Sequence, residues 1–235
     1  MPKNNFYKPI NLGIFFEYLP HQTGNFTQSF YNLKEVLKLS ETNKFVFTID
    51  YKVYKFLKSK NIDSYFIKLG KLDKIYEFIL RYSSPGLSKF LRKLFGSNTI
   101  EKKLLNLNID LVYFTSQSFL AEHLDNINYI YTIYDLAHID MPEFPEFNKS
   151  IFKSRNRILN TSLKRAVAVL CESPGGYEKI VNEYNISPKR LHISKLFSPL
   201  INSKYIQQNK IDRKDNDSLY LIYPAAFWPH KNHVY

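Results

Sequence analysis

The stretch Ile10-Asn-Leu-Gly-Ile-Phe-Phe16 is an apolar run of strand length, and a helical pattern follows it at residues 25–39. In that pattern, Phe26, Phe30, Leu33 and Leu37 recur at the spacing of one helix face. A continuous apolar run is typical of a strand buried on both faces, as in a parallel sheet. Together the two segments predict a β-α unit, which is the repeating part of a doubly wound fold.

The same alternation continues along most of the chain. Further strands are predicted at residues 45–49, 65–69, 110–114, 129–133, 167–171 and 191–194. Helices are predicted at residues 53–60, 72–81, 87–107 with a break near Gly96, 119–124, 151–165 and 174–184. The sequence therefore predicts an α/β fold with a doubly wound, mostly parallel, Rossmann-like sheet.

The chain divides into three parts. Residues 1–195 form the predicted Rossmann-like domain, and residues 196–217 are a polar, charged linker. The apolar stretch Tyr220-Leu-Ile-Tyr-Pro-Ala-Ala-Phe-Trp-Pro-His-Lys-Asn-His233 then runs into a proline-bounded turn. Because such a strand needs partners on both sides, residues 218–235 are expected to be the first strand and loop of a truncated second domain.

Charge restricts the classes of partner. The net charge is +12, and lysine supplies most of it. A basic surface suits phosphate-rich partners such as nucleotides, anionic lipids or nucleic acid, while scattered lysines are often simply solvated. Nucleic-acid binding would favour more arginine in a concentrated stripe with aromatic residues between. No nucleic-acid partner is therefore expected.

Other features bear on location. The single Cys171 cannot form an internal disulfide and fits a buried thiol in a reducing compartment. No export signal or run of about 20 apolar residues is present, so a cytoplasmic protein is predicted. Residues 87–95 group their apolar side chains on one helix face and their basic side chains elsewhere. This pattern fits either packing on the sheet, which is favoured, or peripheral contact with a membrane.

Doubly wound folds bind ligands at the carboxyl ends of their strands, so the loops at residues 17–24, 134–147 and 224–233 are candidates for a site. In the first, Thr23 or Asn25 can cap the following helix, and Gly24 lets backbone N–H groups approach an anion. A plain turn also explains Gly24, and it is the favoured interpretation when this loop is considered alone.

The second loop places Asp135 and His138 directly after a strand. The two side chains could act as a general base and its orienting partner, or bind sugar hydroxyls. Alternatively, Asp135 caps a turn and His138 packs in the loop. Several carboxylates with one histidine are a poor zinc signature, so no metal is expected. In the third loop, Lys231 suits a nucleotide diphosphate, although an isolated lysine is often only solvent-exposed.

Four segments together resemble the family 4 glycosyltransferases, which are retaining enzymes of the two-domain GT-B fold. They are Ile14-Phe-Phe-Glu-Tyr-Leu-Pro20 with Gly24, Thr132-Ile-Tyr-Asp-Leu-Ala-His138 with Pro142-Glu-Phe-Pro145, Leu163-Lys-Arg-Ala166 leading to Cys171-Glu-Ser173, and Tyr223-Pro-Ala-Ala-Phe-Trp-Pro-His-Lys-Asn232. The resemblance implies an acceptor-binding N-terminal domain, a nucleotide-sugar donor and no metal cofactor.

The resemblance also implies roles for single residues. Gly24 would face the donor phosphates and the acceptor, Asp135 and His138 would line the cleft near the transferred sugar, and Lys231 would stabilise the departing diphosphate. Tyr134 stands where the family typically has histidine, and Asn25 where it often has a second glycine. The family's paired donor-binding glutamates have no counterpart before the last residue, Tyr235.

The predicted function is therefore the acceptor half of a retaining glycosyltransferase, inactive as an isolated chain. A glycan or a lipid-linked saccharide is the expected acceptor, and a separate C-terminal half is an expected partner. Two alternatives remain: a non-catalytic α/β domain that binds a glycan or a nucleotide, and a basic protein of membrane surfaces or nucleic acid.

Overall fold

The computed structural model describes residues 9–82, 98–195, 221–223, 225 and 227–233. The helix predicted at residues 87–95 and the linker predicted at 196–217 lie outside this part of the chain.

Seven parallel strands form one sheet in the order β3-β2-β1-β4-β5-β6-β7. The strands are β1 (Ile10–Phe15), β2 (Thr42–Thr48), β3 (Ser64–Phe66), β4 (Leu111–Phe114), β5 (Asn128–Ile133), β6 (Ala168–Cys171) and β7 (Leu191–Ile193). The order reverses direction between β1 and β4, as in a Rossmann-like doubly wound sheet. The predicted fold class is confirmed.

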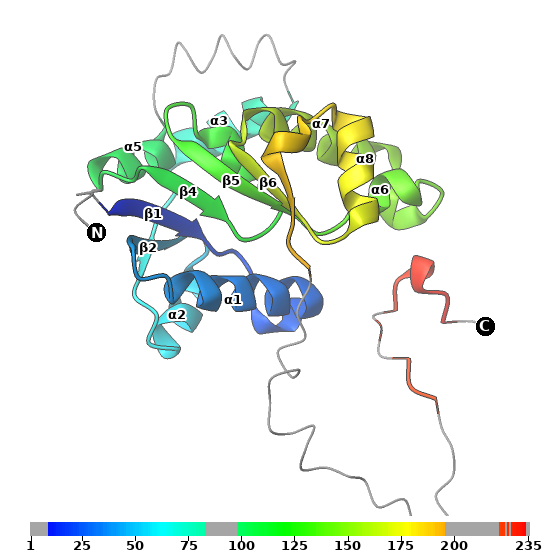
Figure 1. Cartoon of the computed structure of the whole chain (residues 1–235), viewed down its shortest axis with the longest axis horizontal. Coiled ribbons are helices and arrows are strands. Elements are labelled where there is room, and N and C mark those ends of the chain that lie inside the picture. Colours follow the sequence, from blue (N-terminus) through cyan, green and yellow to red (C-terminus); the bar gives the residue numbers. More distant parts are fainter. Residues whose placement is uncertain (1–8, 83–97, 196–220, 224, 226, 234–235) are drawn as a thin grey trace, which may run out of the picture.

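Helices cover the two faces of the sheet unequally (Figure 1). Helices α1 (Thr23–Leu37) and α2 (Tyr51–Ser59) lie on one face. Helices α3 (Lys71–Tyr82), α5 (Thr99–Asn106), α7 (Lys149–Arg165) and α8 (Pro174–Tyr184) lie on the other. Short elements complete the described chain: α6 (Ala137–Asp140) and the 3-10 turns η1 (Pro20–Gln22), η2 (Phe119–His123), η3 (Pro145–Phe147), η4 (Pro188–Arg190) and η5 (Pro229–Lys231).

Strand β1 shows why an unbroken apolar run is required. Leu12 and Ile14 point into the core that α1 and α2 cover, whereas Phe15 points into the core on the opposite face. Between them, Gly13 leaves room for close packing, since a Cβ atom there would lie 3.1 Å from Ile109 Cγ2 and 3.3 Å from Phe47 Cε2. The central strand is thus buried on both faces, which orients the loop that follows it.

Asparagine residues end several helices. Asn61, Asn108 and Asn185 adopt the left-handed conformation just after α2, α5 and α8, with φ of 56°, 51° and 51°. Asparagine tolerates this conformation better than most side chains. In the described chain, asparagine thus takes helix-end positions that glycine often occupies.

All seven predicted strands of the Rossmann-like domain are confirmed to within a few residues. The loop predicted at residues 134–147 contains α6 and η3, which its polar composition did not indicate. Leu221–Tyr223, in the segment expected to begin a second domain, belong to no strand of this sheet and are exposed, so that expectation stays a prediction. No described strand pairs with this segment, so it does not join the sheet. Within the described residues, no helix combines the length and apolarity needed to cross a bilayer.

Candidate functional site

Four neighbouring connections are among those that leave the sheet at the edge where the parallel strands end. They are residues 16–19 after β1, 115–118 after β4, 134–136 after β5 and 172–173 after β6. We call this region the carboxyl edge. Because the strand order reverses between β1 and β4, the carboxyl edge is the position at which doubly wound folds bind ligands.

Glu17 is the most perturbed acid of the carboxyl edge. It follows the buried β1 directly, and its side chain is partly buried. Burial raises the pKa of Glu17 to about 7, and a hydrogen bond with the Ser118 side chain opposes that rise. A carboxyl group with such a pKa can hold or release a proton near neutral pH, as sites of acid-base chemistry require.

Tyr18 lies beside Glu17 and reaches the connection after β4. Burial raises the pKa of Tyr18, while a hydrogen bond with the Ser116 side chain opposes that rise. The charges of Glu17 and Asp135 raise it further. The connections after β1, β4 and β5 therefore bring their polar side chains within electrostatic range of one another.

Arg155, which projects from α7, organises the same region. Its Nη2 donates to Asp135 Oδ1 at 2.9 Å and to Gln117 Oε1 at 3.1 Å. Gln117 Nε2 in turn donates to the backbone oxygen of Asp135 at 2.7 Å. The guanidinium also lies 5.9 Å from the centre of the Phe147 ring. A charged, planar side chain thus ties α7 to the connections after β4 and β5.

Ser118 is held by the buried Tyr131. The Tyr131 hydroxyl accepts from the Ser118 amide at 2.9 Å and donates to the Ser118 carbonyl oxygen at 3.0 Å. Ser118 Oγ accepts from the Leu120 amide at 3.1 Å. The side chain that bonds Glu17 is therefore positioned by the core, which favours a rigid arrangement.

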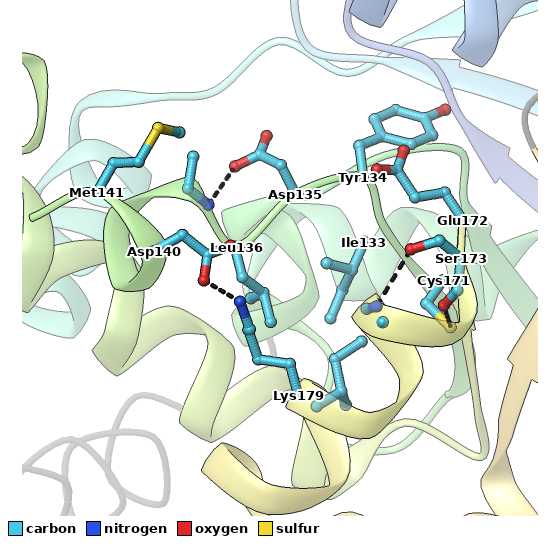
Figure 2. A pocket seen from close by; sticks show the side chains of 14 residues that line it. Ile133, Tyr134, Asp135, Leu136, Asp140, Met141, Cys171, Glu172, Ser173 and Lys179 are labelled. Atoms are coloured by element: carbon cyan, nitrogen blue, oxygen red, sulfur yellow. Dashed lines mark hydrogen bonds and ion pairs between the residues drawn. The ribbon is translucent and has the colours of Figure 1, made fainter. Parts of the chain in front are cut away.

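A pocket of about 340 Å³ opens between β5, β6 and the first turn of α8 (Figure 2). Asp135 and Glu172 line it from the ends of β5 and β6. Burial and the charge of Asp135 raise the pKa of Glu172. Lys179 of α8 pairs with Asp140 across the pocket, as Figure 2 shows. Two carboxylates and an ion pair in a hollow of this size can accept hydrogen bonds from several hydroxyl groups.

His138 does not line this pocket. Its ring is fully buried, with Nε2 3.4 Å from the Tyr184 hydroxyl and its centre 5.7 Å from the centre of the Phe152 ring. Burial lowers the pKa of His138 to about 4, and the charge of Arg155 lowers it too. The side chain is therefore neutral at physiological pH, and direct contact with a substrate would require it to move.

Tyr134, at the position where the resemblance expects histidine, closes a network between α1 and the sheet. Its hydroxyl donates to the Thr115 carbonyl oxygen at 2.5 Å. It also lies 3.1 Å from Ser29 Oγ and accepts from Asn32 Nδ2 at 3.3 Å. These contacts turn the side chain toward α1, so its hydroxyl is not available to the pocket.

Gly24 is an exposed residue in the first turn of α1. Nothing lies within 4 Å of the position that a Cβ atom would take. The cap expected from Thr23 or Asn25 is wrong, because the helix begins at Thr23 and Gln22 occupies the cap position without a side-chain cap. Gln22 Oε1 instead accepts from the Leu19 amide at 2.6 Å and tightens the preceding turn.

The segment at residues 227–233, which contains η5, contacts the loop at residues 134–147 through His230. The His230 amide donates to Glu146 Oε1 at 3.2 Å, and the imidazole Nδ1 contacts the same oxygen. The imidazole ring centre lies 5.9 Å from that of Phe147 and 6.2 Å from that of Phe144. Lys231 is exposed in η5. Two of the loops singled out from the sequence are thus in contact, although neither Lys231 nor Gly24 lies in the pocket lined by Asp135.

Several residues of the carboxyl edge were missed from the sequence. Glu17, Ser116, Gln117, Ser118 and Glu172 all follow a strand end directly, so the ligand rule for doubly wound folds could have found them. Arg155 carried no such signal, because it lies within α7 and one arginine in a polar helix is unremarkable.

Comparisons with known proteins give distant similarities. No family model and no curated protein matches the chain. Among solved structures, a glycosyltransferase from Rickettsia africae ESF-5 is 14% identical, with a TM-score of 0.45 over 80% of this chain and 43% of that one. A UDP-glucosyltransferase from Polygonum tinctorium is 11% identical, with a TM-score of 0.42 over 89% of this chain and 56% of that one. This chain thus spans about half the length of these two proteins, and both likenesses are too distant to assign it an activity.

Proposed function

We propose that this chain forms the acceptor-binding half of a retaining glycosyltransferase that transfers sugar from a nucleotide-sugar to a glycan or a lipid-linked acceptor. The proposal rests on the meeting of distant sequence segments at one edge of the sheet. Segments of the sequence resemblance that lie far apart along the chain end at one edge of the sheet, at Glu17, Asp135 and Glu172. A fourth segment reaches the loop that follows Asp135 through the contact between His230 and Glu146.

The chemistry of the carboxyl edge suits a sugar acceptor. Carboxylates, hydroxyls and an amide lie among aromatic rings, and such groups pair with saccharide hydroxyls as acceptors and donors. With its pKa of about 7, Glu17 is suited to hydrogen-bond the acceptor hydroxyl and to take its proton as the new glycosidic bond forms. Asp135 would orient the sugar while Arg155 holds its carboxylate in place. In this proposal, a second domain binds the donor, and that domain is either covalently attached or a separate chain.

A non-catalytic domain that binds glycan is the second candidate, and the positions of two side chains favour it. The resemblance places His138 and the residue at position 134 beside the transferred sugar. In the structure, His138 is fully buried and the Tyr134 hydroxyl is engaged by α1 and by the connection after β4. A domain with these two side chains withdrawn could retain an acceptor without supporting transfer.

Saccharide binding tests the part common to both candidates. Saturation-transfer NMR with a panel of mono- and oligosaccharides should detect binding to the chain, and Tyr18→Phe should weaken it. The control is Tyr51→Phe, since Tyr51 is an exposed tyrosine at the start of α2, outside the four connections that define the carboxyl edge. Equal effects of the two substitutions, or no binding by any saccharide, would remove the proposal.

Transfer separates the two candidates. The chain is co-expressed with a candidate donor-binding half and incubated with nucleotide-sugars and a bound saccharide, and glycosylated product is sought by mass spectrometry. Product that depends on Glu17 supports the enzyme. Saccharide binding without product under any pairing supports the non-catalytic domain.

A further inference from the structure

Helix α3 carries large apolar side chains on its outer face. The exposed fractions of Leu72, Ile75 and Phe78 are 80%, 55% and 63%. Scattered exposed apolar residues are ordinary, but three on one short helix form a continuous apolar strip. A helix that only covers a sheet has the reverse arrangement, with its apolar side inward.

The inner side of α3 is held by polar contacts. Asp73 is buried, and its carboxylate accepts from the Gly70 amide at 2.7 Å and from the Thr99 amide at 3.2 Å. Tyr76, one turn further along, is also buried. These contacts fix the rotation of the helix, so the apolar side chains cannot turn inward without breaking them.

Lysines flank the apolar strip. Lys71 and Lys74 are exposed, and each lies four residues before an exposed apolar side chain, Ile75 or Phe78. Residues at this spacing share one face of a helix. Neither lysine forms an ion pair with an acidic residue of the described chain. We call the surface formed by Lys71, Leu72, Lys74, Ile75 and Phe78 the α3 face.

We propose that the α3 face docks this chain on an anionic lipid bilayer, with α3 lying in the plane of the interface. Leu72, Ile75 and Phe78 would enter the boundary between headgroups and acyl chains, and Lys71 and Lys74 would contact lipid phosphates. Charge decides among possible occupants. Nucleic acid would attract the lysines without accommodating the apolar strip, whereas a second copy of the chain would bring the same lysines and a net charge of +12 toward them.

The sheet topology determines where the α3 face lies relative to the carboxyl edge. Helix α3 begins shortly after β3 ends, so its first turn lies toward the carboxyl edge. A chain docked through α3 would therefore hold the carboxyl edge near the bilayer. The docking itself does not depend on the proposed transfer reaction.

Co-sedimentation with vesicles tests the proposal. The full chain is mixed with vesicles of phosphatidylcholine alone, or of phosphatidylcholine with phosphatidylglycerol. We expect binding to the mixed vesicles that weakens at high salt, and much less binding to the neutral vesicles. No binding to the anionic vesicles by the wild-type chain would overturn the proposal.

Two sets of variants separate the apolar contribution from the charge contribution. The double variant Ile75→Ser, Phe78→Ser should lower partitioning onto the mixed vesicles on the order of a hundred-fold. The double variant Lys71→Glu, Lys74→Glu should lower it at least about twenty-fold. Ile151→Ser is the matched control, because Ile151 is an exposed apolar residue on α7, and it should bind as the wild type does.

Other occupants of the α3 face give different results. If another part of the chain covers it, Ile75→Ser with Phe78→Ser should lower the melting temperature without affecting vesicle binding. If a second copy covers it, the same variant should lower the mass measured by sedimentation velocity. Either result contradicts lipid docking.

A polarity-sensitive dye gives a second measurement. Since the single native Cys171 is buried, a cysteine introduced by Phe78→Cys can be labelled selectively. The emission of the dye should shift to shorter wavelength on addition of anionic vesicles, and a label at Ile151→Cys should show no shift. Equal behaviour of the two labels would contradict insertion of the α3 face.

Discussion

Arg155 Nη2 lies 2.9 Å from Asp135 Oδ1, although the two residues are 20 positions apart and belong to a helix and a strand-end loop. The same nitrogen holds Gln117. A helix of the outer layer thereby positions a carboxylate that lines the pocket. This arrangement links the stability of α7 to the shape of the carboxyl edge.

Replacing Arg155 should therefore affect binding more than stability. The exposed fractions of the two side chains, 28% and 47%, limit the contribution of the ion pair to about 1 kcal/mol at most. Arg155→Met should lower the free energy of unfolding by that amount and weaken saccharide binding about ten-fold or more. Urea denaturation and titration calorimetry measure the two effects.

Arg165→Met is the matched control for this substitution. Arg165 also lies on α7, and its Nη2 is 3.2 Å from Asp125 Oδ1. The control should lose similar stability and keep its affinity for saccharide. If both variants keep full affinity, Arg155 does not position the binding site.

Glu17→Gln should make the protein more stable at alkaline pH. The pKa of Glu17 is raised from 4.5 in the unfolded chain to about 7 in the fold, so the folded state binds the extra proton between these values. Stability is thus lost as pH rises through this window, and the neutral amide avoids the loss. The gain should be roughly 1 to 3 kcal/mol near pH 8 and close to zero near pH 4.5.

Thermal unfolding across this pH range measures the gain. Glu41→Gln serves as the control, because Glu41 is exposed in the turn before β2. A Glu17→Gln curve that runs parallel to that of the wild type at every pH would show that Glu17 is ionised at an ordinary pKa.

His138→Gln should change the pH dependence in the opposite sense. The pKa of His138 falls from 6.5 in the unfolded chain to about 4 in the fold, so the unfolded state binds more protons between these values. Its contribution to stability is therefore complete above pH 6.5 and is lost as pH falls toward 4. The variant should lose stability less steeply than the wild type on acidification.

Urea denaturation at several acidic pH values makes this comparison, with the exposed His21 changed to glutamine as the control. The windows of Glu17 and His138 overlap, so their effects partly cancel in the wild type and are separated only in the single variants. Identical acid profiles for wild type and His138→Gln would contradict a buried, neutral imidazole.

His230→Ala should release η5 from the loop at Glu146. The hydrogen bond from His230 lowers the pKa of Glu146, so this contact contributes stability at neutral pH and loses it as pH falls below the usual carboxyl range. Amide hydrogen exchange at position 230 should become faster in the variant, while exchange in β4 and β5 stays unchanged.

Lys231→Ala is the control for this release, because Lys231 is the exposed neighbour in the same turn. It should leave exchange at His230 as in the wild type. Equal exchange in the wild type and both variants would show that the contact between His230 and Glu146 is absent in solution.

The sheet could be predicted from the sequence because its strands are buried on both faces. Runs such as Ile10–Phe15 and Asn128–Ile133 are mostly apolar on both faces and too short for a typical helix, which favours buried strands. Short elements in polar loops were harder to predict from the sequence. Helix α6 spans only Ala137–Asp140 and depends on tertiary contacts, for example the packing of His138 against Tyr184 and Phe152, that no local pattern shows.

The candidate site was only partly predictable. Asp135 was found because it follows a strand and belongs to a recognisable motif. Glu17 also follows a strand, but what distinguishes it is burial next to Ser118 from another strand end, which depends on the fold. Sequence spacing likewise paired Asp135 with His138, whereas the structure pairs Asp135 with Arg155 and turns His138 into the core. Side-chain direction within a short loop is set by tertiary packing, which spacing does not encode.

Amide chemical-shift mapping during a saccharide titration is the decisive test of whether the carboxyl edge binds saccharide. We expect residues 17–18, 116–118, 135 and 172 to shift together with one dissociation constant. We expect no shift for Asp63, which directly precedes β3 at the opposite edge of the sheet. Shifts that cluster away from the carboxyl edge, or no shifts with any saccharide, would contradict saccharide binding there.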